Sequence, residues 1–245
     1  MSNATLRMLI HKSMYKFHLL VPKKFIWWRL HSSEYHPDVE GIIARIETAK
    51  HSPDEYSLLQ FWSAHLHYPL NVSGKRVLEI GHGGGWYLAE MLDSGAESVC
   101  GLEISGALNK RASQALKKLG YSNFELVLGN GRNLSALAGL SFDFIYANTV
   151  VQHLSTRTLK KYLTEISRLL TPEGLCVLQV LQTHLPASQK RLSGADLFSV
   201  AYTSSELESL LGTSGFTIQA FGDIDYGKDE NFWGLYVFSK NKISF

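Results

Sequence analysis

The most constraining feature of this 245-residue chain is the run from residue 77 to residue 86, Val-Leu-Glu-Ile-Gly-His-Gly-Gly-Gly-Trp. Its apolar first half is typical of a buried strand, and its glycines predict a tight turn that leads into a helix. Glycines at 81, 83 and 85 permit positive φ angles and place no side chain between the backbone and a ligand. The run therefore predicts a loop against which a cofactor can lie directly.

The spacing of these glycines does not fit the fingerprint of dinucleotide-binding folds. That fingerprint, Gly-x-Gly-x-x-Gly/Ala, requires a small residue at its sixth position. Counted from Gly81 the sixth position is Trp86, and counted from Gly83 it is Leu88. The loop therefore favours a nucleotide-type fold of another family.

Apolar runs of strand length continue along the chain and alternate with helical patterns. The clearest helical pattern extends from Ser155 to Leu170, and the segment Thr171 to Gly174 predicts a turn after it. Such alternation is typical of an α/β, doubly wound parallel sheet, whose ligand crevice lies beyond the carboxyl ends of its strands. The last two runs are joined by a short segment, which predicts an antiparallel hairpin. The seven predicted strands are residues 77–80, 99–102, 124–128, 142–147, 175–181, 216–220 and 233–238.

The N-terminal part of the chain has a different character. Residues 1–33 contain six basic and no acidic side chains, and apolar residues recur at helical spacing from Leu6 to Val21. This basic amphipathic segment is interpreted either as a helical cover over the active site or as an arm that contacts a membrane surface or a partner. A second helix is predicted to begin at residues 52–55, Ser-Pro-Asp-Glu. We expect a helical extension over residues 1–70 and a main domain over residues 71–245.

Composition limits the class of protein. The net charge of +2 gives no reason to expect a nucleic-acid partner. No apolar stretch approaches the roughly 18 residues that span a bilayer. Cys100 and Cys176 lie in predicted strands and are expected to be reduced core thiols, which suggests a reducing compartment. We therefore expect a cytoplasmic protein.

Several motifs, in order, resemble those of one family. An acid inside the first strand, Glu79, followed by Gly-x-Gly-x-Gly, resembles the first motif of the class I S-adenosylmethionine (SAM) dependent methyltransferases. Glu103 closes the second predicted strand about twenty residues later, and the resemblance covers about residues 70 to 240. It implies a Rossmann-like seven-stranded sheet, SAM as cofactor, S-adenosylhomocysteine (SAH) as product and no metal. It further implies a small-molecule methyl acceptor, with oxygen favoured as the methylated atom.

The resemblance also implies which residues contact the cofactor. A carboxylate at Glu103 can accept hydrogen bonds from both ribose hydroxyls. The segment around Asn130 resembles the loop that contacts the adenine ring, although the family more often has Asp there. Two residues depart from the family pattern: His82 stands where a small residue is usual, and Trp86 is bulky. The expected cofactor-binding residues are Glu79, Gly81, His82, Gly83, Gly85, Glu103, Ile104, Asn130, Gly131 and Asn148.

Catalysis needs little acid–base chemistry, because the methyl group of SAM is already activated and the protein chiefly aligns a nucleophile. His153 follows the fourth strand and is a candidate general base, while the alternative is that it only braces the loop. The pair His65 and His67 lacks a third metal ligand. Aromatic residues such as Phe61 and Trp62 are interpreted as core or as a lid, and residues 183–201 as a second substrate wall.

Two classes of function remain open from the sequence. The first is a SAM-dependent methyltransferase of small molecules. The second is a catalytically degenerate SAM fold that serves as a binding or interaction module, motivated by His82, Trp86 and Asn130. Asn148 is followed by Thr149, so the Asn-Pro-Pro-Tyr motif of nucleic-acid amino methylation is absent, although other nucleic-acid methyltransferases lack it too.

Overall fold

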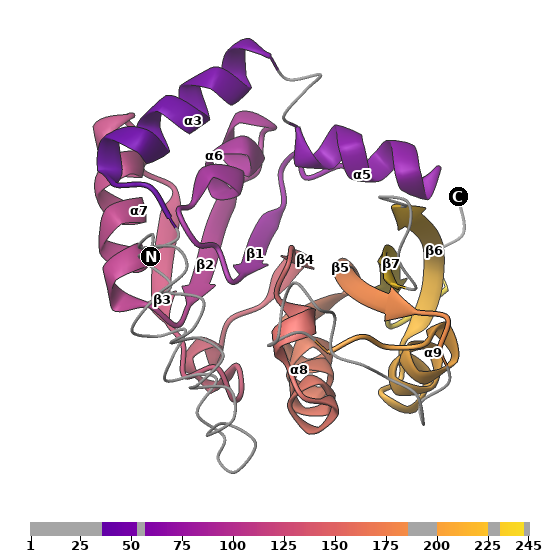
Figure 1. Cartoon of the computed structure of the whole chain (residues 1–245). Helices are drawn as coiled ribbons and strands as arrows, with labels where there is room; N and C mark the ends of the chain where they lie inside the picture. Colours follow the sequence, from indigo (N-terminus) through magenta and orange to yellow (C-terminus); the bar gives the residue numbers. More distant parts are fainter. Residues whose placement is uncertain (1–35, 53–56, 186–199, 225–230, 243–245) are drawn as a thin grey trace, which may run out of the picture.

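A computed structural model describes residues 36–52, 57–185, 200–224 and 231–242 of the chain. Its centre is a seven-stranded sheet with the order β3-β2-β1-β4-β5-β7-β6 (Figure 1). Strands β1 to β5 pair in parallel, whereas β7 is antiparallel to both of its neighbours. The predicted doubly wound sheet with an antiparallel C-terminal hairpin is confirmed. The strands are β1 (Arg76–Ile80), β2 (Ser98–Glu103), β3 (Phe124–Leu128), β4 (Phe142–Ala147), β5 (Leu170–Thr183), β6 (Thr217–Ile224) and β7 (Asn231–Ser239).

Helices cover both faces of this sheet and form two cores. The helices packed on one face are α3 (Val39–His51), α5 (Leu58–Leu66), α6 (Trp86–Asp93) and α7 (Gly106–Lys118). Those on the other face are α8 (Thr156–Leu169) and α9 (Ser204–Thr213), and short 3₁₀ turns occur at Ser135–Leu137 and Val151–His153. The residues of α3 and α5 share one apolar core with the sheet, so the described part of the N-terminal region packs directly on the main domain.

The central strands are apolar along their whole length because both of their faces are covered. In β1, Val77 packs toward α6, while Leu78 packs toward α8, and both side chains are fully buried. Polar residues in such a strand are exceptional, which makes the buried Glu79 conspicuous.

Local signals fix most helix boundaries. The helix predicted from Ser155 to Leu170 is α8; Ser155 is its N-cap, and the Ser155 hydroxyl accepts a hydrogen bond from the backbone N–H of Thr158. The predicted turn after this helix was wrong, because β5 begins at Leu170, directly after α8. The residues from 171 to 174 are accommodated by a shift in the register between β4 and β5.

The helix that carries Phe61 and Trp62 begins at Leu58 and has Ser57 as its N-cap. Of the predicted helix start at residues 52–55, Ser52 is the C-cap of α3, and residues 53–55 lie outside the described residues. The basic amphipathic helix predicted before Pro22 also lies outside them. Within the described part of the chain, every helix is too short or too polar to cross a membrane.

The predicted core thiols are confirmed. Cys100 in β2 and Cys176 in β5 are both buried and unbridged. Burial raises the pKa of the Cys100 thiol to about 12, so this thiol is neutral at physiological pH and behaves as an apolar side chain.

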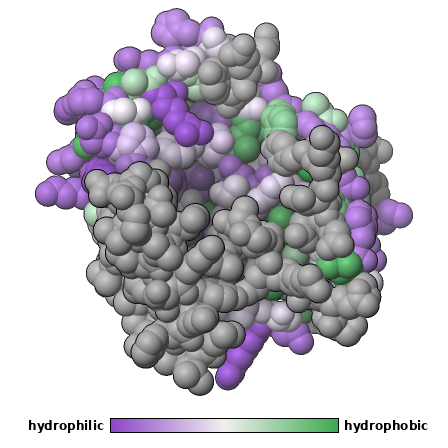
Figure 2. Space-filling model, in the orientation of Figure 1, coloured by the Kyte–Doolittle hydropathy of each residue, from purple (hydrophilic) through white to green (hydrophobic). Residues whose placement is uncertain are grey.

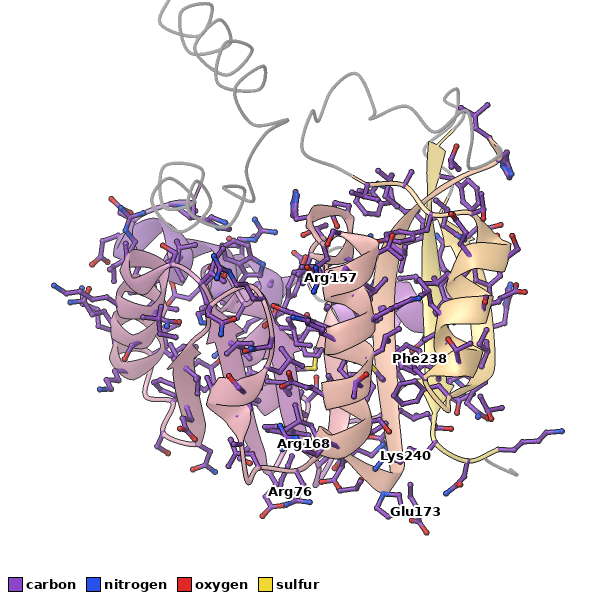
Figure 3. All side chains as sticks on the ribbon, turned by 90° about the horizontal axis from the view of Figure 1, so that it is seen from below. Arg76, Arg157, Arg168, Glu173, Phe238 and Lys240 are labelled. Atoms are coloured by element: carbon purple, nitrogen blue, oxygen red, sulfur yellow. The ribbon has the colours of Figure 1, made fainter. Side chains whose placement is uncertain are left out.

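Charged side chains gather at the end of the sheet where the strands begin. Figure 3 shows Arg76, Arg168, Glu173 and Lys240 at this end, and Arg157 at the opposite end of α8. The guanidinium of Arg76 pairs with Asp143 at 3.2 Å, which joins the starts of β1 and β4. The carboxyl ends of the strands lie at the opposite edge, which is where ligands bind in open α/β sheets.

Gly101, in the middle of β2, illustrates how closely the elements pack. A Cβ atom on this residue would lie 2.6 Å from Cδ2 of His82, 2.8 Å from Cδ1 of Leu88 and 2.9 Å from Cδ2 of Leu126. The space that other residues would need for Cβ is therefore already filled by the His82 ring and two leucines.

We expect Gly101→Ala to lower the free energy of unfolding by about 1–3 kcal/mol, because the added methyl group overpacks the core. Gly106→Ala is the matched control, since nothing lies within 4 Å of a Cβ atom at this first residue of α7. The control should raise stability by at most about 1 kcal/mol. Urea unfolding measures both changes, and equal stabilities of the two variants would contradict the predicted packing.

Candidate active site

The candidate site lies where the strand order of the sheet reverses. β1 and β4 are neighbours, but the chain leaves β1 toward β2 and leaves β4 toward β5, on opposite sides. In open α/β sheets, ligands bind at this point, outside the carboxyl ends of the strands. The glycine loop after β1, Glu103 at the end of β2 and Asn148 after β4 meet there.

The glycine loop adopts a conformation that other residues would strain. Gly81, Gly83 and Gly85 have φ angles of 78°, 54° and 79°. A Cβ atom on Gly81 would lie 2.4 Å from the Val150 side chain, so the loop after β4 packs directly on this backbone. Gly85 is the N-cap of α6, which makes the loop the start of the helix, as the sequence predicted.

Glu103 holds the loop in place. It is 7% exposed, and its Oε2 accepts a hydrogen bond from the backbone N–H of Gly83 at 3.2 Å. Its Oε1 accepts hydrogen bonds from the backbone N–H groups of Ile104 at 2.8 Å and Ser105 at 2.9 Å. One carboxylate therefore connects the loop after β1 to the residues that begin α7.

A cavity of about 230 Å³ lies against this carboxylate. Several of the residues expected to bind the cofactor or to act in catalysis line it. These residues are Gly81, Gly83, Glu103, Ile104, Gly131, Asn148 and His153. The structure thus brings together residues from the ends of β1, β2, β4 and the loop after β3.

The other expected cofactor residues do not line this cavity. Glu79 is buried in β1, where its Oε2 accepts a hydrogen bond from the Tyr146 hydroxyl at 2.9 Å. Burial raises the pKa of this carboxyl to about 8, although the Tyr146 hydrogen bond opposes the shift. Gly85 contributes only its backbone conformation at the start of α6.

His82 and Asn130 support the loops in which they lie. The His82 ring is 2% exposed, packs beside Gly101, and its Nε2 donates to Oδ1 of Asn109 at 2.6 Å. Burial lowers the pKa of this imidazole, so it is neutral at physiological pH. Oδ1 of Asn130 accepts hydrogen bonds from the backbone N–H groups of Arg132 and Asn133, which fixes the turn that presents Gly131 to the cavity.

His153 lies in the 3₁₀ turn after β4 and lines the cavity. Its Nε2 is 3.4 Å from Nε2 of Gln152, whose amide in turn donates to the Thr149 carbonyl at 2.6 Å. This position is compatible with either of the two roles that the sequence left open.

His36 is a cavity-lining residue that the sequence did not reveal. A Cβ atom on Gly83 would lie 2.8 Å from Cε1 of His36, and the imidazole centroid is 5.5 Å from that of Trp86. Burial lowers the pKa of this imidazole. His36 precedes α3, and no local motif marks it, because only tertiary packing brings it over the glycine loop.

A second cavity, of about 610 Å³, adjoins the first. It lies among α3, α5 and α6, and Asn148 and Thr149 line both cavities. Figure 2 shows a hollow in this face, bordered by hydrophilic residues on the side of α3 and by hydrophobic residues on the side of α5. The larger cavity thus lies next to the smaller one, across the residues that follow β4.

The backbone at the junction of the cavities is strained. Thr149 has a φ angle of 56°, which costs a β-branched residue about 1–2 kcal/mol. Its backbone N–H donates to Oε1 of Gln179 in β5 at 3.0 Å, and its carbonyl accepts from Gln152. Two glutamine side chains therefore hold this peptide segment in a conformation that it would not adopt alone.

Comparison with known proteins shows a match to one domain family over part of the chain. Residues 78–178 match the family model described as "Methyltransferase domain". Among curated proteins, protein-L-isoaspartate O-methyltransferase 2 of Rhodopseudomonas palustris (strain HaA2) is 36% identical over 104 residues, which are 42% of this chain and 43% of the relative. The protein-L-isoaspartate O-methyltransferase of Methanococcus aeolicus is 30% identical over 107 residues, with 42% and 48% coverage. The chain therefore spans less than half the length of these curated relatives.

Solved structures with the same fold cover more of the chain. Magnesium protoporphyrin IX methyltransferase from Synechocystis PCC 6803, solved with bound SAM, superposes with a TM-score of 0.61 at 17% identity, over 90% of this chain and 98% of that one. The [4+2]-cyclase SpnF also reaches a TM-score of 0.61, at 16% identity, with 76% and 81% coverage. Residues 78–178 thus match a methyltransferase domain, and the chain has the fold of solved SAM-dependent methyltransferases.

We expect Glu103→Ala to weaken SAM binding by roughly 1.5–3 kcal/mol, the scale of hydrogen bonds to a charged group. The substitution also removes the acceptor of three backbone N–H groups, so the free energy of unfolding should fall. Calorimetric titration with SAM and urea unfolding separate the two effects. Unchanged affinity would contradict the assignment, and Glu125→Gln, on the edge strand β3, is the control.

The buried Glu79 predicts a pH dependence of stability. The Glu79 carboxyl holds its proton more tightly in the folded chain than in the unfolded chain. Its contribution to the free energy of unfolding is therefore complete below pH 4.5 and is lost as the pH rises toward about 8. Glu79→Gln is neutral at every pH and retains an acceptor for Tyr146. The variant should therefore lose less stability than the wild type between about pH 5 and about pH 8. Urea unfolding over this range measures the change, and Glu47→Gln on α3 is the control. The prediction would be contradicted if the free energies of unfolding of the wild type, Glu79→Gln and Glu47→Gln changed in parallel with pH.

Proposed function

We propose that this chain transfers the methyl group of SAM to a small-molecule acceptor, most readily at an oxygen atom, and releases SAH. The observation that carries the proposal is the pair of adjoining cavities that share Asn148 and Thr149. One is bordered by the glycine loop and Glu103, and the other is a larger space beside it. Two adjacent compartments suit a reaction in which a donor and an acceptor meet.

The smaller cavity has the groups that the nucleoside part of SAM requires. The Glu103 carboxylate suits the ribose hydroxyls, and Ile104 and Gly131 offer apolar and backbone surface for the base. The glycine loop lets the chain of the cofactor approach the backbone. When bound, SAM supplies an activated methyl group, and these residues would fix its position without taking part in bond formation.

The size of the second cavity favours a small molecule over a protein as acceptor. A space of about 610 Å³ is within the range of roughly 300–1,000 Å³ that is typical of small-molecule sites. The curated relatives are methyltransferases of proteins by name, but each of those cited matches less than half of its length here. Geranyl diphosphate methyltransferase, a small-molecule enzyme by name, shares the fold with a TM-score of 0.61 at 13% identity.

A fold of this class does not by itself establish methyl transfer. The [4+2]-cyclase SpnF, which shares this fold with a TM-score of 0.61, is named for a different reaction. The alternative is a catalytically degenerate binding module, and the experiment below distinguishes it from an active methyltransferase. The three residues that motivated it, His82, Trp86 and Asn130, do not line the smaller cavity.

The test has two stages. Calorimetric titration with SAM and SAH, with NAD as control, establishes whether the cofactor site is intact. An acceptor screen that detects SAH formation from SAM then tests turnover. Binding of SAM without SAH formation for any acceptor, in protein that is demonstrably folded, would favour the binding module, and failure to bind SAM would contradict the proposal as a whole.

His153 provides a prediction that separates its two possible roles. If His153 removes a proton from the acceptor, His153→Ala should reduce the turnover number about 10²–10⁴-fold with SAM affinity retained. If it only braces the turn after β4, the variant should instead lose stability. His51→Ala, at the end of α3 and outside both cavities, is the control, and unchanged turnover with unchanged stability would contradict both roles.

A further inference from the structure

Four aromatic side chains, together called the aromatic wall, line the larger cavity. Phe61 and Trp62 come from α5, and Trp86 and Tyr87 come from the first turn of α6. Flat apolar ligands fit such a wall, because aromatic rings provide large contact areas at a small cost in side-chain entropy. The aromatic wall therefore favours an acceptor with a flat apolar surface.

Arg45 lines this cavity and has no ion-pair partner among the described residues. Its guanidinium carbon lies 4.0 Å above the Trp86 ring, and the side chain also hydrogen bonds to Tyr87. Within the part of the chain that the structure describes, no carboxylate lies within ion-pair distance of Arg45. The aromatic contacts thus hold the guanidinium in one place while leaving its charge available.

The other charged groups of the cavity are already paired. Lys50 lies 3.5 Å from Asp93. The Glu90 carboxylate accepts hydrogen bonds from the Ser57 hydroxyl and from the backbone N–H groups of Leu58 and Leu59, so it serves to start α5. Arg45 is therefore the charge in this set that a ligand would complement.

Two further hydrogen-bond donors of this cavity have no acceptor in the part of the chain that the structure describes. The indole Nε1 atoms of Trp62 and Trp86 are buried, and neither has a hydrogen-bond partner among the described residues. Buried donors are almost always satisfied in folded proteins, so two unsatisfied donors in residues of one cavity indicate that a ligand or water supplies the acceptors. A positive charge and unsatisfied donors both favour an electron-rich ligand.

We propose that the methyl acceptor is a small organic anion with a flat apolar body, whose anionic group binds Arg45 and whose body lies against the aromatic wall. The proposal rests on the proposed function, since it concerns the acceptor of that reaction. The anion does not belong to the cofactor, because Arg45 lines the larger cavity, whereas Glu103 and Gly131 at the nucleoside end line the smaller one.

The experiment compares two probes that differ only in charge, naphthalene-2-carboxylate and naphthalene-2-carboxamide. Each is titrated calorimetrically into the full chain in the presence of saturating SAH, which fills the cofactor site. The wild type should bind the carboxylate about three- to tenfold more tightly than the carboxamide, the range expected for a partly exposed ion pair. Arg45→Gln should abolish this preference, and Arg45→Lys should retain part of it.

Control variants separate Arg45 from general charge effects. Lys50→Gln removes a cation of the same cavity that is already paired, and Lys160→Gln removes an exposed cation of α8, so both should leave the preference unchanged. Equal affinities of the wild type for the two probes, including no measurable binding of either, would overturn the proposal. Persistence of the preference in Arg45→Gln would overturn it too.

The SAH titration distinguishes failure of this inference from failure of the proposed function. If Arg45→Gln weakens SAH binding as strongly as it weakens carboxylate binding, Arg45 serves the cofactor and the inference is wrong. If the folded wild type does not bind SAH, the proposed function is wrong, whatever the probes show. Circular dichroism of each variant verifies the fold, and the Arg45→Lys variant tests the site even where Arg45→Gln does not fold.

Discussion

The site depends on one carboxylate. Glu103 accepts backbone hydrogen bonds from the glycine loop after β1 and from the two residues after β2, and it does so at 7% exposure. Because hydrogen bonds to a buried charge are among the strongest in proteins, this group holds the loops after β1 and β2 in a fixed relative position. The same side chain borders the smaller cavity. A single residue therefore contributes both to the geometry of the loops and to the lining of the cavity.

A second constraint acts after β4, where the two cavities meet. Thr149 adopts a left-handed backbone conformation and is held there by Gln179 from β5 and by Gln152 from the following turn. Strained conformations persist only where the surrounding structure determines them, and they concentrate at functional sites. The strain at Thr149 supports the idea that the segment between the cavities has a fixed shape that positions an acceptor beside the cofactor.

The two bulky residues of the glycine loop, His82 and Trp86, fit because neighbouring elements leave space for their side chains. The His82 ring occupies space that exists because residue 101 is a glycine, and it bonds to Asn109 in α7. Trp86 turns toward α3, where Arg45 and His36 contact its ring. Both bulky side chains therefore pack away from the smaller cavity, and neither departure from the family pattern fills the space expected for the cofactor.

The sequence by itself determined the strands, the helix that begins after Ser155, the hairpin and the glycine loop, because these depend on local periodicity, capping and backbone freedom. It also indicated Glu103, whose position follows from its spacing in the fold. Only the tertiary structure decided that His36 and Arg45 lie over the glycine loop and Trp86, since no local pattern encodes contacts between distant segments. It also decided that Glu79, His82 and Asn130 support the site from outside the smaller cavity, because the direction and partners of a side chain depend on how the elements pack.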